Sequence, residues 1–405
     1  MVAEISAKKS AGRFLSVVFI FFCIAFQSFG QIVTSEVFGY TIDMPEMSYI
    51  ADYSEDETAV LFLHQLLPVQ TAIRIWEQEK FQNSKECLES TLKKTGGTGL
   101  FSEVVWRNLS CSICEFTLDK NVMGEKMAGW GICVPLVQKK SYIAALSFAP
   151  EKNAFDCLQF ILSVLDSISI DNAGLRQPGI VTTFAFPRNN PKKITVSAGG
   201  LKIATEIDDC DEEANQFVID REFAVFKLFA SQKCWKEAWQ RFYRLIAKDA
   251  AVRLRKPAFD IFTKLENSSR KKDPESPDFQ TAQELLYSVQ NFPYERKDSD
   301  PSKADFTSLP AVLCGKGSDC DSRSLLLMTM FTSMGLDSIM LVSVDYSHAM
   351  VGLHQEGKLG QSYTLDGKEY LFGETTAKKM TFGKIDSKMQ DRSKWIPVEL
   401  YGLGL

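Results

Sequence analysis

The stretch GKGSDCDSRSLLLMTMFTSMG, residues 315–335, decides how the C-terminal half of the chain is expected to fold. Its apolar residues from Leu325 to Met334 recur at helical spacing, which predicts one broad apolar face on a buried helix. Gly335 stands where such a helix would stop, and Ser318 or Asp319 can cap its first turn. We therefore expect Cys320 to lie in the first turn of a buried helix.

A thiol in that position has an environment that can activate it. Free backbone N–H groups and the positive end of the helix dipole favour an anion there, and the thiolate is the nucleophilic form of cysteine. Asp319 and Asp321 flank Cys320, and their negative charge would raise the pKa of the thiol if the carboxylates point at it. The sequence leaves the direction of these carboxylates open.

A histidine beside Cys320 would favour the thiolate, and the chain has only three histidines. His64 lies in an apolar strand pattern and is expected to be a packed core residue. His348 and His354 share the predicted strand HAMVGLH and face the same way, but they lie about 20 Å apart along it, so only one can serve Cys320. His348 follows the turn DYS at the strand start and is the expected partner.

The segment LDGKEYLFGETTA, residues 365–377, predicts a hairpin turn and a further strand that ends at Glu374. An adjacent strand could place the Glu374 carboxylate beside the imidazole of His348 and hold its tautomer. Asp366 is the competing acid, although its position before Gly367 is more typical of the turn itself.

This order of elements resembles the transglutaminase-like cysteine peptidase superfamily over roughly residues 217–383. The phrases that carry the resemblance are LLYSVQNFPYERK, SLPAVLCGKGSDCDSRSLLLMTMFTSMGLDSIMLV, SHAMVGL and YLFGETTAKKMTFGKI. They look like a bacterial and archaeal branch with a Gly-Asp-Cys motif, H-x-A-V-G strands and an acid followed by two threonines. The chain departs from the family pattern at Ser318, where glycine is common, at Met350, where an aromatic is common, and at Glu374, which replaces aspartate.

The resemblance implies a papain-like domain, with the nucleophile at the start of a buried helix packed on an antiparallel sheet. It implies Cys320 as nucleophile, His348 as general base and acid, and Glu374 as the orienting acid. The expected reaction is attack on a peptide or glutamine-type amide of a protein or peptide substrate, through a cysteine thioester, with no metal or organic cofactor. The alternative is a catalytically inactive binding module of the cell envelope. Cys320 could also form a disulfide with Cys314, six residues earlier.

The chain is expected to be an α+β protein of two domains. Residues 31–170 alternate apolar and polar side chains over short runs, which predicts an antiparallel sheet with helices, and the opening FGYTIDMP resembles small secreted domains of the Mog1/PsbP type. Residues 171–196 are rich in proline, glycine and asparagine and are interpreted as a linker. The transglutaminase-like domain is expected over 197–405.

The first thirty residues have the pattern of a secretory signal peptide: three basic residues, an apolar run over 14–26, and small residues before Gln31. We therefore expect an exported protein, periplasmic or extracellular, with no stable membrane span after cleavage. Removal of residues 1–30 changes the formal charge from -5 to -7, which argues against nucleic acid as a partner. Nine cysteines remain, so export would permit disulfides but leave at least one thiol unpaired.

Overall fold

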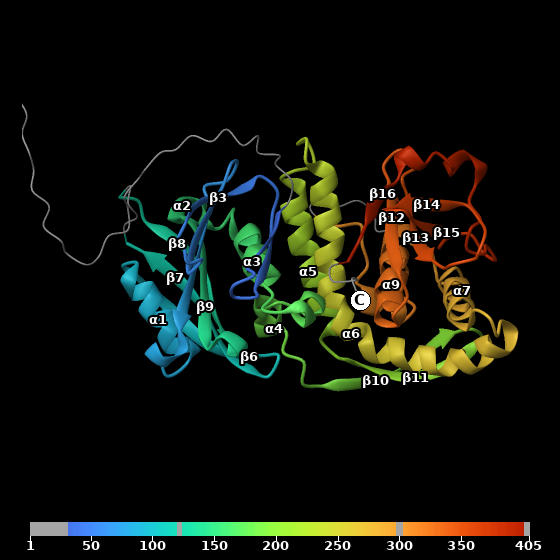
Figure 1. Cartoon of the computed structure of the whole chain (residues 1–405), viewed down its shortest axis with the longest axis horizontal. Coiled ribbons are helices and arrows are strands. Elements are labelled where there is room, and N and C mark those ends of the chain that lie inside the picture. Colours follow the sequence, from blue (N-terminus) through green and yellow to red (C-terminus); the bar gives the residue numbers. More distant parts are fainter. Residues whose placement is uncertain (1–30, 120–123, 297–302, 401–405) are drawn as a thin grey trace, which may run out of the picture.

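The structure is a computed structural model that describes residues 31–119, 124–296 and 303–400, so the predicted signal peptide lies outside the described residues. The fold is α+β, and its two main sheets are antiparallel, as expected. Figure 1 shows one sheet in each half of the molecule, with α5 (Asp211–Lys227) and the first part of α6 (Trp235–Lys272) standing between them.

The N-terminal half is built on an antiparallel sheet that has seven strands within the described ranges. In spatial order the strands are β3 (Ser48–Tyr53), β4 (Ala59–His64), β5 (Gln70–Glu77), β9 (Ser141–Pro150), β8 (Met127–Leu136), β7 (Leu109–Leu118) and β6 (Gly97–Trp106). A separate hairpin pairs β1 (Gln31–Thr34) with β2 (Thr41–Met44). The short helical turns of this half are η1 (Gln78–Lys80), η2 (Val137–Lys139) and α2 (Glu151–Ala154).

Helices cover both faces of this sheet. α1 (Ser84–Lys94) packs on one face with Cys114 and Cys133, whereas α3 (Leu158–Ser167) packs on the other with Cys111. Every residue of β9 is buried because the strand is covered from both sides, which explains its continuous apolar sequence. Cys111 and Cys114 lie within β7, so their CxxC spacing belongs to a strand and not to the start of a helix.

The C-terminal half begins with a hairpin of β10 (Pro191–Ala198) and β11 (Leu201–Asp208) and continues mainly as helices before a second antiparallel sheet. α6 changes direction along its length in Figure 1, and Pro257 inside it removes one backbone donor and explains a bend. The later helices are α7 (Pro277–Val289), α8 (Leu309–Leu313) and α9 (Cys320–Ser333).

The second sheet lies against α9 and has the spatial order β14-β15-β13-β12-β16. These strands are β12 (Ser338–Ser343), β13 (His348–His354), β14 (Ser362–Leu365), β15 (Lys368–Gly373) and β16 (Ile396–Val398), with short turns η4 (Ser387–Met389) and η5 (Arg392–Lys394) before the last. Asp366 and Gly367 have positive φ angles and form the β14–β15 turn, as predicted.

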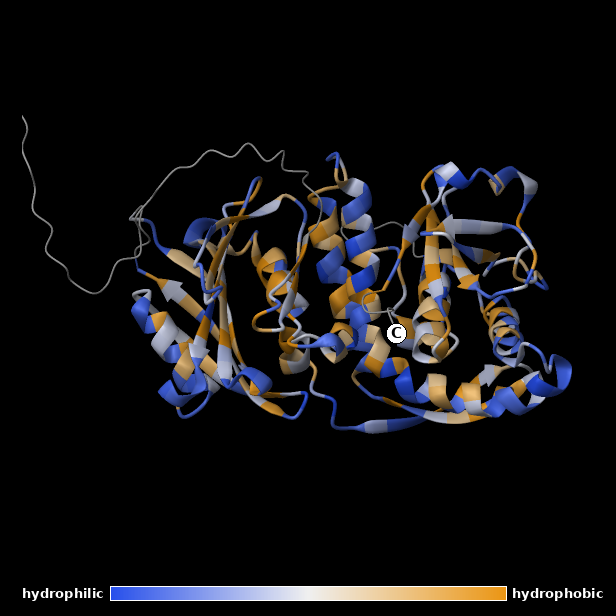
Figure 2. Ribbon diagram, in the orientation of Figure 1, coloured by the Kyte–Doolittle hydropathy of each residue, from blue (hydrophilic) through white to orange (hydrophobic). Residues whose placement is uncertain are grey.

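α9 is the central helix of the C-terminal half. Its apolar side chains are buried among α6, α7, α8 and the sheet, and Figure 2 shows it as a largely hydrophobic ribbon. It begins at Cys320 and its N-cap is Asp319, whose carboxylate accepts from Ser322 N at 2.9 Å. Gly335 adopts φ +81° directly after the helix, where its N–H bonds to Thr332 O. The predicted start and end of this helix are confirmed.

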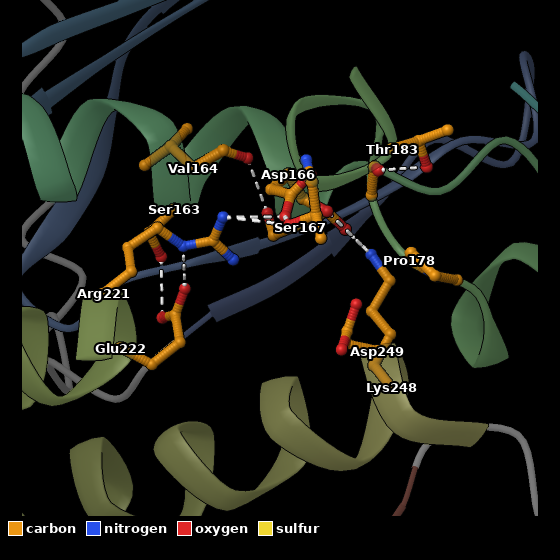
Figure 3. Close-up of polar contacts among 12 residues, drawn as sticks. Ser163, Val164, Asp166, Ser167, Pro178, Thr183, Arg221, Glu222, Lys248 and Asp249 are labelled. Carbon is orange, nitrogen blue, oxygen red and sulfur yellow. Dashed lines mark hydrogen bonds and ion pairs between the residues drawn. The ribbon is translucent and has the colours of Figure 1, made fainter. Parts of the chain in front are cut away.

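A buried charge network, shown in Figure 3, joins the two halves. Arg221 on α5 bonds to Asp166 on α3 at 2.7 Å and to the neighbouring Glu222 at 2.7 Å. The ammonium of Lys248 donates to the backbone carbonyls of Asp166 and Ser167, at 3.0 and 2.8 Å, and so caps the C-terminal end of α3. A desolvated network of this kind fixes the relative position of α3, α5 and α6.

The segment predicted as a linker, residues 171–196, carries secondary structure of its own. It contains η3 (Asn172–Arg176), α4 (Ile180–Ala185) and the beginning of β10. Asp166 accepts hydrogen bonds from the backbone N–H of Thr182 at 3.0 Å and from its hydroxyl, so α4 is tied to α3. Among the helices of the described ranges, none combines the length and the apolar character needed to cross a membrane.

Candidate functional site

The three predicted site residues meet where α9 begins beside the start of β13. Cys320 is the first residue of α9 and is 2% exposed. The backbone N–H of Ala349, the residue after His348, lies near enough to this thiol to lower its pKa. Glu374 directly follows β15, whose last residue, Gly373, pairs with Val351 of β13. The antiparallel register therefore carries the acid back to the strand start where His348 lies.

His348 and Glu374 form a direct contact: Nε2 of His348 lies 2.7 Å from Oε2 of Glu374. The other carboxylate oxygen of Glu374 accepts from Thr376 twice, from its backbone N–H at 2.7 Å and from its hydroxyl at 2.6 Å. Thr376, the second threonine of the ETT sequence, thus holds Oε1 of Glu374, while Oε2 of Glu374 faces the imidazole of His348.

These contacts fix the protonation of the pair. Burial would raise the pKa of Glu374, but the hydrogen bonds from His348 and Thr376 outweigh it, so the pKa of this carboxyl is lowered. An ionised carboxylate only accepts hydrogen bonds, so Nε2 of His348 must carry a proton. In the neutral imidazole the lone pair is then on Nδ1, which is the nitrogen available to receive a proton from a thiol.

The thiol itself faces a carboxylate. The Sγ atom of Cys320 donates to Oδ1 of Asp321 at 3.3 Å, which settles the direction that the sequence left open. Burial raises the pKa of Cys320, and the charges of Asp321 and Asp319 raise it further, against the lowering effect of the Ala349 N–H. The thiolate expected from a helix N-terminus is therefore disfavoured here, because burial and two aspartates oppose the helix dipole.

Asp321 is held in turn by a residue far away in the sequence. The hydroxyl of Tyr243, on α6, donates to Oδ2 of Asp321 at 2.5 Å. Tyr243 is 1% exposed and packs against the rings of Trp239, Phe242 and Phe306. The position of the Asp321 carboxylate is therefore set by a rigid aromatic cluster.

Two buried polar side chains fasten the loops around the site. Arg323, on α9, donates to Ser318 Oγ at 3.2 Å, to Thr375 O at 3.2 Å and to Phe292 O at 2.8 Å. Gln290, at the end of α7, donates to Glu374 O and to Met380 O, both at 2.8 Å. The loop after β15 is thereby tied to α9 and α7, which fixes the backbone on either side of Glu374.

The indole ring of Trp395 packs against His348. The rings of Trp395 and His348 meet edge to face with centroids 6.5 Å apart, and the indole nitrogen of Trp395 donates to Met389 O at 3.0 Å. Trp395 is buried, so it limits the orientations open to the imidazole. The side chain of His348 is 12% exposed, more than the Cys320 residue beside it.

The other histidines lie away from Cys320, and Cys314, its possible disulfide partner, is not bonded to it. His354 is at the far end of β13, where its Nδ1 lies 2.9 Å from Glu369 O. His64 is buried, with Nδ1 accepting from the N–H groups of Leu66 and Leu67, so it is a packed residue as predicted. Cys314 is exposed and Cys320 is buried, and both thiols are free in the structure.

Ligand-type atoms of Asp319, Cys320 and Asp321 lie within 4.8 Å of one another, which is close enough for one metal ion. Each of these atoms already has a protein partner: Ser322 N for Asp319, the Cys320 thiol and Tyr243 for Asp321. We assign no metal to this cluster.

Sequence reasoning did not identify Tyr243, Gln290, Arg323 or Trp395 as parts of the site. Tyr243 and Gln290 are distant from Cys320 in sequence, and only the packing of α6 and α7 brings them there. Arg323 had a local signal, because a cationic residue inside an apolar helix must find buried acceptors. Thr376 had one too, in the ETT sequence itself.

Comparisons with known proteins give weak structural neighbours. No protein-family model matches the chain, and no curated protein matches it by sequence. The Ran-binding protein Mog1p of Saccharomyces cerevisiae is 10% identical, with a TM-score of 0.27, and covers 36% of this chain and 96% of its own. Cyanobacterial PsbP of Synechocystis is 11% identical, with a TM-score of 0.30, and covers 36% and 95%.

A protein of Bacteroides thetaiotaomicron aligns over more of the molecule, covering 81% of this chain and 88% of its own, at 8% identity and a TM-score of 0.24. Mog1 and PsbP-like proteins are thus weak neighbours of the N-terminal part, the two types named from the sequence. No comparison identifies a transglutaminase-like domain in the C-terminal half.

Proposed function

We propose that the chain is an exported thiol enzyme of the transglutaminase-like type, with Cys320 as nucleophile, His348 as base and acid, and Glu374 as orienting acid. The observation that carries this proposal is the 2.7 Å contact between His348 and Glu374 at the start of β13, the strand whose Ala349 N–H lowers the pKa of Cys320. An oriented imidazole next to a thiol at a helix start is the arrangement that nucleophilic thiol catalysis needs.

The proposed reaction begins when Cys320 transfers its proton to Nδ1 of His348. The thiolate attacks the carbonyl carbon of an amide, a C–S bond forms, and the backbone N–H groups at the start of α9 stabilise the developing oxyanion. The C–N bond then breaks, and the leaving nitrogen takes the proton from the imidazolium. Water or an amine next attacks the thioester, gives its proton to His348, and restores the thiol.

The substrate class is a protein or peptide, with attack at a peptide bond or at a glutamine-type side-chain amide. Export, which the proposal adopts from the N-terminal sequence pattern, would place such substrates in the cell envelope or outside the cell. His348 is the most exposed of the three side chains, so the amide is proposed to approach over the imidazole.

A second candidate is a non-catalytic binding module of the cell envelope. The observation that favours it is the thiol itself, which is 2% exposed and has a pKa raised by burial and by Asp321. A protonated, enclosed thiol is a poor nucleophile unless substrate binding changes its surroundings.

Alkylation of Cys320 by iodoacetamide across a pH series, read by peptide mass spectrometry, distinguishes these candidates. For the enzyme, His348→Ala is expected to slow alkylation of Cys320 at pH 7 and leave alkylation of the exposed Cys314 unchanged. Equal rates at Cys320 in both proteins would reject the triad and favour the binding module. Release of ammonia from a glutamine peptide, or incorporation of a labelled amine, then separates hydrolysis from transfer.

A further inference from the structure

The structure shows the thiol of Cys320 hydrogen-bonded to an acceptor that lies outside the proposed triad. Its proton points to Oδ1 of Asp321 at 3.3 Å, whereas Nδ1 of His348 is the acceptor that catalysis requires. Both oxygens of Asp321 accept hydrogen bonds, one from Cys320 and one from Tyr243; burial raises the pKa of this carboxyl, and the two donors act against that rise.

We propose that Asp321, held by Tyr243, is a restraining residue that keeps Cys320 in its neutral thiol form until substrate enters. This inference rests on the proposed function and adds a regulation of the same site. In the resting protein the S–H bond is intact and donates to Asp321. Rotation of the thiol from Asp321 to Nδ1 of His348 lets the proton move from sulfur to nitrogen, which gives the thiolate and an imidazolium stabilised by Glu374.

The surroundings support a restraint of this kind. Tyr243 cannot follow the thiol, because its ring is enclosed by Trp239, Phe242 and Phe306. The carboxylate therefore stays where it is while Cys320 changes partner. Burial raises the pKa of Tyr243, and the charge of Asp321 raises it further, so its hydroxyl remains a donor through the physiological range.

Other charged groups act on this thiol and must be separated from Asp321. They are Asp319 and Arg323 on α9, His348 on β13 with Glu374 after β15, Asp305 before α8, and Tyr294 and Arg296 after α7. Asp319 provides the matched control, because it adjoins Cys320 on the other side. Its carboxylate accepts from Ser322 N, and the structure places the thiol hydrogen bond on Asp321.

The test measures the pH midpoint of Cys320 alkylation by iodoacetamide in the full chain. Asp321→Asn is expected to lower the midpoint by at least one pH unit. At pH 7, alkylation should become about threefold faster for each unit by which the pKa of the thiol falls. The factor is below ten because a thiolate of lower pKa is a weaker nucleophile. Asp319→Asn keeps the N-cap and removes the same charge, and its shift is expected to be clearly smaller.

Tyr243→Phe should act in the same direction. It removes the donor that holds Asp321 and lowers the pKa of its carboxyl, so less negative charge opposes the thiolate and the midpoint falls. Equal shifts in Asp321→Asn and Asp319→Asn, or no shift in Asp321→Asn, would overturn the restraint.

The outcome is independent of the triad. A shift in Asp321→Asn together with no effect of His348→Ala would keep the restraint and reject the proposed function. The reverse pattern would keep the triad and reject the restraint. Circular dichroism of each variant confirms that a changed midpoint reports the site and not unfolding.

Discussion

Cys320 shows how local and tertiary effects compete at a single residue. A helix N-terminus contributes about 0.3–1 kcal/mol to an anion, which is less than one pKa unit at about 1.4 kcal/mol per unit. Burial and the two neighbouring aspartates act in the other direction and raise the pKa of the thiol. These effects outweigh the helix dipole, so the resting residue is a thiol, and in the proposed mechanism its activation depends on His348.

Glu374→Gln is expected to reduce acyl transfer by roughly 10²-fold or more. The neutral amide cannot stabilise an imidazolium, and an NH₂ group turned toward Thr376 N–H would place two donors face to face. Turnover of a glutamine peptide at pH 7 measures the loss. Glu374→Asp, which keeps the charge, is the control and should retain more activity, and equal rates in both variants would contradict the orienting role.

At the scale of elements, α9 is the best example of a helix that its own sequence specifies. Asp319 caps it, Gly335 follows its end, and most side chains between them are buried. Arg323 is the cationic residue among them, and its three acceptors come from Ser318, Thr375 and Phe292. This guanidinium joins the helix to the loops that carry the site.

Arg323→Lys is expected to destabilise the protein by about 2–4 kcal/mol. Lysine keeps the charge, but its compact ammonium cannot reach three acceptors in different directions, so buried carbonyl groups lose their donors. Urea unfolding gives the free energy. Arg270→Lys on the exposed end of α6 is the matched control and should change stability by less than about 0.5 kcal/mol. An equal loss of stability at both positions would contradict the role of Arg323 in joining α9 to these loops.

At the scale of the whole molecule, buried charges join the two halves. Arg221 is 3% exposed and pairs with Asp166 of the N-terminal half and Glu222 of its own helix. Glu222 also pairs with Arg241 at 3.0 Å, so Asp166 is the buried carboxylate that depends most on Arg221.

Arg221→Met is expected to lower the free energy of unfolding by about 3–5 kcal/mol, because it leaves the buried Asp166 carboxylate without its ion-pair partner. Lys80→Met, which removes an exposed ion pair with Glu77, should cost less than about 1 kcal/mol. Thermal unfolding at pH 7 compares them. A loss in Arg221→Met as small as in the control would mean that the network adds no stability.

Glu46 makes the junction sensitive to pH. Burial raises the pKa of this carboxyl to about 7, above its ordinary value of 4.5, and its Oε1 lacks a hydrogen-bond partner among the described residues. Between pH 4.5 and pH 7, the Glu46 carboxyl is ionised in the unfolded chain but still protonated in the folded protein. Stability from this group is therefore complete below pH 4.5 and is lost as the pH rises to 7.

Glu46→Gln is expected to remove this loss. Relative to the unchanged protein, the variant should gain up to about 3 kcal/mol on going from pH 4.5 to pH 8, since 1.4 kcal/mol corresponds to each pKa unit. Unfolding free energies of both proteins at the two pH values give the difference. The same difference at both values would show that Glu46 titrates normally.

The sequence alone determined the features that depend on neighbours along the chain. The stop at Gly335, the Asp366-Gly367 turn and the strand that starts at His348 were predicted and found, and of the two predicted caps, Ser318 and Asp319, the structure has Asp319. These follow from backbone preferences and from the period of apolar residues, which act over a few positions. The order of Cys320, His348 and Glu374 was readable for the same reason.

Only the tertiary structure decided where side chains from distant segments point. It turned Asp321 toward the thiol, brought Tyr243 from α6 to hold it, and placed Nε2 of His348 on Glu374. It also packed the predicted linker against α3 and joined the halves through Arg221. Such contacts depend on how whole elements pack and on which buried polar groups must be satisfied, and neither is encoded in the local pattern of residues.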